Sequence, residues 1–222
     1  GALGVAFDEA TPEDLDRIST YGFRGEALAA IAEAADLEIL SRVAGKDGFR
    51  LAEEKGTWRV MPCAMAPGTI LLARRLFTRA PARRKFLSTP RGEAMRCLRI
   101  LERTALARAD VAWRVVSEGE EVFRTSGAGA EETAASVFGR EKAESLLEVE
   151  AVLSAMTITG QVSPPEETGK TRGGFYFCVN GRPVDSPALF SAVRSAFETL
   201  LPPGRHPGAR AASSGRGRRG AA

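Results

Sequence analysis

The chain has 222 residues, of which 44% are hydrophobic and 27% charged, an ordinary balance for a globular protein with one large or two small domains. No apolar run approaches the roughly 18 residues that a membrane-spanning helix needs, so no membrane segment is predicted. Three widely spaced cysteines and a single histidine argue against a disulfide framework and against a histidine-rich metal site.

The net charge of +3 comes from the end of the chain. Beyond Pro203 there are five arginines and no acid, and without them 26 basic residues face 28 acidic ones, a net charge of −2. Whole-chain charge is therefore poor evidence for nucleic-acid binding. Residues 204–222 are mostly Gly, Arg, Ala and Ser, too poor in apolar side chains to pack, which predicts a disordered basic tail.

The first half of the chain predicts a pair of helices followed by antiparallel strands. The run Thr11-Pro12-Glu13-Asp14 is typical of a helix start, and a second helix is expected to end at about Ala35, because apolar residues before it recur at helical spacing. Four strands are predicted, the middle two as a hairpin: residues 37–43, 49–51, 57–61 and 69–72. This order is typical of an α+β layered fold.

The second half predicts another unit that mixes helices and strands. A long helix is expected over residues 91–108, then a hairpin, a helix ended by Gly139, and a strand over residues 157–162. A further strand ends in the turn sequence Asn180-Gly181, and Ser186-Pro187 is typical of the start of a last helix.

Two glycines, Gly22 and Gly25, lie three residues apart where a helical pattern begins. Glycine permits close backbone approaches, and a helix start offers free N–H groups that suit a phosphate. A plain structural turn has the same spacing, so the spacing alone does not decide between the two.

A basic stretch lies in the middle of the chain. From Arg74 to Arg108 there are eleven Arg or Lys residues and only two acids, Glu93 and Glu102. Such a stretch can neutralise nucleic-acid phosphates, but it is equally typical of a solvated helix face.

Three motifs carry a family resemblance. The run Gly-Phe-Arg-Gly-Glu-Ala-Leu at residues 22–28 resembles a signature of the MutL family of DNA mismatch repair ATPases. Gly68-Thr69, with Leu76-Phe77 and residues 81–87, resembles the next signature of that family, and residues 175–184 are similar to its downstream strand-and-turn motif. The motifs occur in the family's order, and the resemblance covers roughly residues 11–207.

The resemblance implies a fold and a domain order. It implies part of a GHKL (Bergerat-type) ATPase sandwich over residues 1–77, a connector over 78–90, and a smaller α+β domain of the ribosomal-protein-like, transducer type over 91–203. Both ends depart abruptly from the family pattern, which we interpret as a chain truncated at both ends by a gene fragment or a change of reading frame.

The resemblance also implies binding residues for ATP, which the family uses with Mg²⁺, and for DNA. The expected ATP phosphate lid and its support are Gly22, Phe23, Arg24, Gly25, Glu26, Ala27, Leu28, Gly68 and Thr69. The expected DNA contacts are Arg83, Arg84, Lys85 and Arg182, although a solvated connector or local carbonyl contacts would explain the same residues.

No catalytic residue and no metal ligand is assigned. In the family a water-activating Glu and a magnesium-holding Asn precede the lid, and only 21 residues stand before Gly22 here. The family's Asp-x-Gly-x-Gly segment is not found, and Arg79 stands where the family usually has Asn.

The function implied is that of a fragment of a MutL-type protein. The intact form would hydrolyse ATP, close on DNA as a homodimer or heterodimer of MutL-type subunits, and couple recognition by a MutS-type protein to repair in the cytoplasm, in the bacterial cytosol or nucleoid. One alternative is a DNA-binding or scaffold module without nucleotide turnover. A GHKL chaperone or topoisomerase fragment is a third, against which residues 81–87 argue.

We predict that this chain alone shows no ATPase activity, because phosphoryl transfer depends on a positioned nucleophile and a bound metal ion. The measurement is phosphate release by purified chain with ATP and Mg²⁺. Magnesium-dependent hydrolysis that Gly25→Val abolishes would contradict the prediction.

Overall fold

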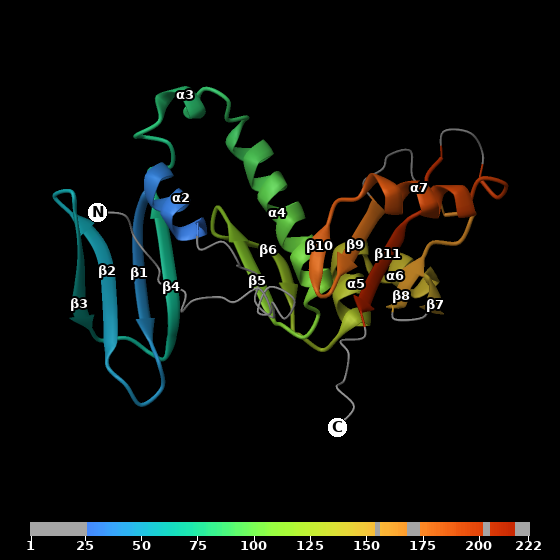
Figure 1. Ribbon diagram of the computed structural model, residues 1–222, viewed down its shortest axis with the longest axis horizontal. Coiled ribbons are helices and arrows are strands. Elements are labelled where there is room, and N and C mark those ends of the chain that lie inside the picture. Colours follow the sequence, from blue (N-terminus) through green and yellow to red (C-terminus); the bar gives the residue numbers. More distant parts are fainter. Residues whose placement is uncertain (1–25, 154–155, 168–173, 202–204, 216–222) are drawn as a thin grey trace. The chain divides into compact units, whose positions relative to one another are not determined.

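The computed structural model describes residues 26–153, 156–167, 174–201 and 205–215, and it divides into two units, Gly1–Thr89 and Pro90–Ala222 (Figure 1). The helix start predicted at Thr11 lies outside the described residues. Both units combine helices with mainly antiparallel strands, so the predicted α+β class is confirmed.

The first unit is a four-stranded antiparallel sheet with a helix before it and a short helix after it. Helix α2 (Ala27–Ala34) leads into strands that lie in the order β3-β2-β1-β4. The predicted hairpin forms, and its turn consists of Lys55 and Gly56, both with positive φ. The remaining elements are β1 (Asp36–Arg42), β2 (Gly48–Glu54), β3 (Thr57–Cys63), β4 (Gly68–Arg74) and α3 (Pro81–Arg84).

The strand register separates the two faces of this sheet, because cross-strand partners point to the same side. One side, which we call the apolar face, is apolar except for Glu53 and two hydroxyl residues at one end, Ser41 and Thr69. Its other members are Leu37, Ile39, Phe49, Leu51, Trp58, Val60, Pro62, Leu71 and Ala73. The opposite side mixes charged residues, among them Glu38, Arg50 and Arg74, with apolar ones such as Leu40, Ile70 and Leu72. Successive side chains of each strand point to opposite faces, so the order of residues along a strand determines which of them lie on each face.

The second unit begins with a long helix and ends in a five-stranded sheet. Its sheet has the order β10-β9-β11-β8-β7, and a separate hairpin pairs β5 with β6. The helices are α4 (Pro90–Ala107), α5 (Ala130–Phe138), α6 (Arg140–Ser145) and α7 (Pro187–Ala196). The strands are β5 (Trp113–Ser117), β6 (Glu120–Thr125), β7 (Leu147–Leu153), β8 (Met156–Val162), β9 (Phe175–Val179), β10 (Arg182–Val184) and β11 (Ala209–Gly215).

The core of the second unit lies around β9. Phe175 and Phe177 are buried and pack against Phe190 and Val193 of α7. Tyr176 points to the other side of the sheet, where its ring meets Phe138 of α5 edge-on at 5.3 Å between centroids. Helices therefore cover both faces of the sheet at β9. None of the helices in the described ranges is long and apolar enough to cross a membrane.

The prediction of a disordered tail over residues 204–222 is wrong for residues 209–215. These residues form β11, which pairs antiparallel with β8 and parallel with β9. A lack of apolar side chains predicts disorder, but a ladder needs only backbone N–H and C=O groups. Two flanking strands supply those partners, so composition is a misleading guide here.

We predict that β11 is required for the second unit to fold cooperatively. A chain cut after Leu201 leaves β8 and β9 without their shared neighbour, at a net cost of about 1 kcal/mol for each ladder hydrogen bond that no longer forms. The measurement is thermal unfolding followed by circular dichroism, with a chain cut after Gly215 as the matched control. Equal cooperativity of the two shortened chains would contradict the prediction.

Candidate nucleotide and DNA sites

The described part of the expected phosphate lid is the start of α2. Gly22, Phe23, Arg24 and Gly25 lie outside the described residues, whereas Glu26, Ala27 and Leu28 lie within them. Glu26 occupies the N-cap position; its side chain accepts no capping hydrogen bond, and its carbonyl accepts one from the Ala30 N–H at 2.9 Å. The helix therefore begins where the motif predicts, with first-turn N–H groups that no side chain of the cap satisfies.

Gly68 and Thr69 begin strand β4, at one end of the apolar face. Gly68 has a φ of +139°, a conformation that favours glycine. Thr69 lies opposite Ser41 on β1, and the two hydroxyl oxygens are 2.9 Å apart. No hydrogen bond or ion pair among the described residues joins residues 26–28 to Gly68 or Thr69.

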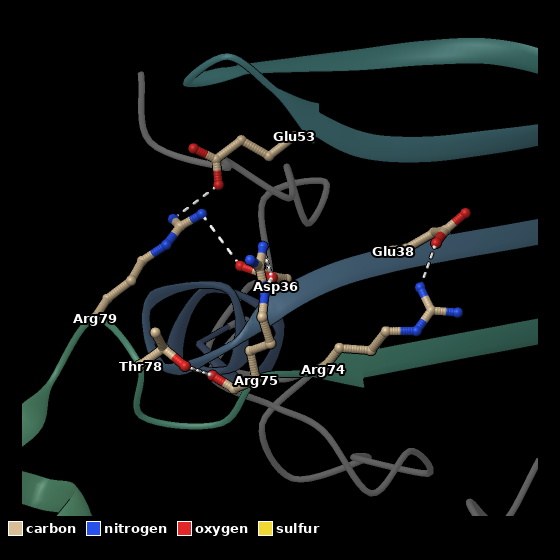
Figure 2. A network of polar contacts seen from close by, with 7 residues as sticks. All are labelled: Asp36, Glu38, Glu53, Arg74, Arg75, Thr78 and Arg79. Carbon is tan, nitrogen blue, oxygen red and sulfur yellow. Dashed lines mark hydrogen bonds and ion pairs between the residues drawn. The ribbon is translucent and has the colours of Figure 1, made fainter.

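Three arginines of the basic stretch are neutralised within the first unit (Figure 2). Arg74 donates to Glu38 at 3.0 Å, and Arg75 forms an ion pair with Asp36. Arg79 bridges Glu53 at 2.9 Å and Asp36 at 3.4 Å. Asp36 and Glu53 thus connect the two arginines of the turn after β4, whereas Arg74, the last residue of β4, forms a separate pair with Glu38 of β1.

The turn that carries Arg75 and Arg79 has an unusual backbone. Arg75 and Phe77 have φ values of 53° and 58°, in the left-handed region that bulky residues rarely adopt. The Phe77 N–H donates to the Ala34 carbonyl at 2.6 Å, and Thr78 Oγ1 donates to the Arg75 carbonyl at 2.7 Å. The ion pairs and these hydrogen bonds together stabilise the turn that follows β4.

The rest of the basic stretch divides into cations with and without a carboxylate partner. In the second unit Arg96 pairs with Glu93, Arg108 with Asp110, and Arg103 with Asp185 at the longer distance of 3.9 Å. In the first unit Arg83, Arg84 and Lys85 are exposed, and no described carboxylate lies within ion-pairing distance of them. These three adjacent residues, on α3 and just after it, are open to an external anion. The exposed Arg91 and Arg99 of α4 likewise form no ion pair with a carboxylate among the described residues.

The fourth expected DNA contact, Arg182, lies in the second unit. It begins β10 directly after the tight turn Asn180-Gly181, whose two residues have φ values of 49° and 75°. The turn prediction is confirmed, since such hairpins need two residues with positive φ. Arg182 is half-buried and already has an interaction with another group of the chain.

An open pocket of about 510 Å³ lies on the second unit between β7, β8 and the start of α5. Its size would suit a nucleotide, but Glu131, Glu148 and Glu150 line it, and their negative charge opposes a phosphate. Across the described ranges, no three His, Cys, Asp or Glu side chains are grouped to hold a metal ion. This pocket is therefore not a candidate site for a phosphate.

Comparisons with known proteins agree with the resemblance. A family model described as DNA mismatch repair protein, C-terminal domain, matches residues 134–211, from within α5 to within β11. The DNA mismatch repair protein MutL of Acidiphilium cryptum is 39% identical over 204 residues, which cover 91% of this chain and 35% of the relative. MutL of Pelotomaculum thermopropionicum is 36% identical over 88% of this chain and 33% of its own length.

The chain belongs to the MutL family. It spans about a third of the length of these curated MutL relatives. The Aquifex aeolicus MutL ATPase domain complexed with ADP is 25% identical, with a TM-score of 0.67 over 92% of this chain and 75% of that one. The N-terminal domain of a DNA repair protein reaches a TM-score of 0.76 over 88% of this chain and 65% of that one, and its 21% identity supports the fold alone. The partial GHKL fold is thereby confirmed.

The ion pairs of the first MutL unit should make its stability depend on pH. Hydrogen bonds from Arg50 and then Arg74 hold the pKa of Glu38 below its ordinary value of 4.5. A carboxylate with a lowered folded pKa stabilises the fold above its unfolded pKa, and this stabilisation is lost as the pH falls through the lowered value. We predict that the stability of the Glu38→Gln variant falls less on acidification than that of the wild-type chain.

The measurement is amide hydrogen exchange in β1 and β4 at neutral pH and below pH ~4.5, the ordinary value for Glu. Glu33→Gln is the matched control, because Glu33 is exposed on α2 and forms no ion pair with a described residue. The prediction fails if the wild-type chain and Glu38→Gln lose protection in parallel on acidification.

Proposed function

We propose that this MutL protein binds ATP with Mg²⁺ through the lid at residues 22–28, supported by Gly68 and Thr69. The Aquifex aeolicus relative that was solved with ADP supports the proposal, since it matches 92% of the chain. Glu26 at the start of α2 and Thr69 at the end of the apolar face fit these roles, because a helix start and a hydroxyl can both donate to phosphate. No residue is proposed as general base or metal ligand.

We further propose that Arg83, Arg84 and Lys85 contact the phosphates of DNA. The observation that carries this proposal is their lack of any described carboxylate partner, in contrast with Arg74, Arg75 and Arg79 in the same unit. An arginine that is already paired must break its ion pair to bind a phosphate, whereas an unpaired one loses only hydration. Arg182 would add a contact from the second unit.

The wider role we propose is that of MutL proteins in mismatch repair. The protein would act as a dimer of MutL-type subunits, receive the signal from a MutS-type mismatch-recognition protein, and work in the cytoplasm at the nucleoid. ATP binding and hydrolysis would belong to the whole protein. The family membership supports these partners, and the curated relatives are about three times as long as this chain.

The DNA proposal is tested by replacing Arg83, Arg84 and Lys85 with alanine. We expect the slope of log affinity against log salt to become shallower by about 0.9 for each DNA phosphate that the variant no longer neutralises. The measurement is fluorescence anisotropy of a labelled duplex over a series of salt concentrations.

Two controls separate local contact from net charge. Alanine at Arg140, Lys142 and Arg194 removes the same charge from exposed positions in the second unit. A chain cut after Gly215 removes Arg216, Arg218 and Arg219 without touching β11. If the controls weaken binding as much as the test variant does, residues 83–85 are not a DNA contact.

A further inference from the structure

Strand β7 forms one edge of the sheet in the second unit (Figure 1). It pairs with β8 on one side, and no backbone group among the described residues pairs with it on the other. In an antiparallel strand alternate residues direct their N–H and C=O groups outward, so an open edge presents a row of unused donors and acceptors. Such a row is a template for one more strand.

The edge at β7 lacks the features that commonly keep a strand from pairing with another chain. Proteins protect their sheet edges with short strands, with proline and with lysine. The opposite edge of the same sheet, β10, has only three residues, and one of them is Pro183. Strand β7 has seven residues, Leu-Glu-Val-Glu-Ala-Val-Leu, without proline, glycine or a basic side chain. It is therefore suited to accept a partner strand along its length.

One face of β7 is acidic and selects the charge of the partner. Glu148 and Glu150 point to the same side as their cross-strand partners Gln161 and Thr159, and all four line the open pocket of about 510 Å³. Glu131, at the start of α5, adds a third carboxylate to its lining. None of these three carboxylates forms an ion pair or a hydrogen bond with another described residue. On this face an added strand would gain most from basic side chains, because opposite charges on neighbouring strands attract.

The other face of β7 is apolar and exposed. Leu147 is 54% exposed and Val149 is 40% exposed. Val162, which lies opposite Leu147 on β8, packs against the core around Phe175 and Phe177, so this face continues the face that α7 covers further along the sheet. An added strand would cover Leu147 and Val149 with every second side chain. Burial of apolar surface is favourable, so these positions of the partner should be apolar.

We propose that β7 binds an extended peptide segment in which basic and apolar residues alternate, as an additional strand of the second sheet. Backbone hydrogen bonds would supply affinity, and the alternate side chains would supply specificity. Lys or Arg side chains would lie beside Glu148 and Glu150, and apolar ones would cover Leu147 and Val149. A second copy of this chain fits less well, because two β7 strands paired with their pockets on the same side would bring like charges together. This inference does not rest on the proposed DNA contact.

The test measures binding of a fluorescein-labelled peptide of alternating lysine and valine to the full chain by fluorescence anisotropy. Replacing both Glu148 and Glu150 with glutamine should weaken binding about fivefold, because each exposed ion pair contributes a factor of about two. Glutamine at Glu118 and Glu120 is the matched control, because these exposed residues of the β5–β6 hairpin carry the same charge and form no ion pair with a described residue. An equal loss in the two variants would overturn the proposal.

Two N-methylated forms of the peptide report strand addition on the wild-type chain. One form is methylated at every lysine amide and the other at every valine amide, so each lacks the N–H donors along one edge of the peptide. Only one edge faces β7, so one form should bind about tenfold or more weakly, as expected for the loss of two or more hydrogen bonds, and the other should keep its affinity. The unmethylated peptide should slow amide hydrogen exchange in β7. Equal binding of the two forms, or unchanged exchange in β7, would contradict strand addition.

Hydrogen exchange of the chain without peptide identifies the other two possible occupants of the edge. If the β7 amides are already protected and lose this protection in a chain cut after Gly215, the basic residues 216–222 of the chain itself occupy the edge. If their protection rises with protein concentration, a second copy occupies it. Either result would overturn the proposal, whereas β7 amides that stay unprotected on their outer side until the peptide is added would support it.

Discussion

Three carboxylates of the first sheet occupy the arginines at the end of β4 and in the turn after it, so these arginines are not available to another molecule. Asp36, Glu38 and Glu53 lie on β1 and β2 and pair with Arg75, Arg74 and Arg79. A partly buried carboxylate without a cation is costly, so these pairs form wherever the geometry allows. The same contacts hold a turn in which Arg75 and Phe77 adopt left-handed backbone angles. Pairing thus stabilises the turn and leaves the charge of residues 83–85 uncompensated.

The second sheet depends on a different kind of constraint. Its central strand, β11, has the sequence Ala-Arg-Ala-Ala-Ser-Ser-Gly, which no scale of strand preference would select. Its place is determined by β8 and β9, which each present an edge for it to pair with. Buried backbone groups must find partners, and a strand of small residues satisfies them as well as one of large residues does. Hydrogen bonding to β8 and β9 therefore outweighs the low strand preference of the residues in β11.

Much of the fold could be predicted from local patterns. The strands of the first unit, the long helix α4, the Asn180-Gly181 turn and the cap at Ser186 each follow from a periodicity or a turn chemistry. The strand β7 was not predicted, although Leu147, Val149 and Ala151 alternate with Glu148 and Glu150 and gave a usable signal. The order of strands around β11 had no local signal, because it arises from pairings between residues far apart in the chain.

The two candidate sites also differ in how far the sequence alone can predict them. A phosphate lid acts through backbone N–H groups and glycine conformations, so its residues can be recognised from a short motif. A DNA contact acts through side-chain charge, and a run of arginines does not reveal which of them are already paired. Arg79 and Arg83 look equivalent in the sequence, yet Arg79 bridges two carboxylates and Arg83 pairs with none among the described residues. That difference depends on strands 26 or more residues away from Arg79, and only the folded sheet brings them within reach.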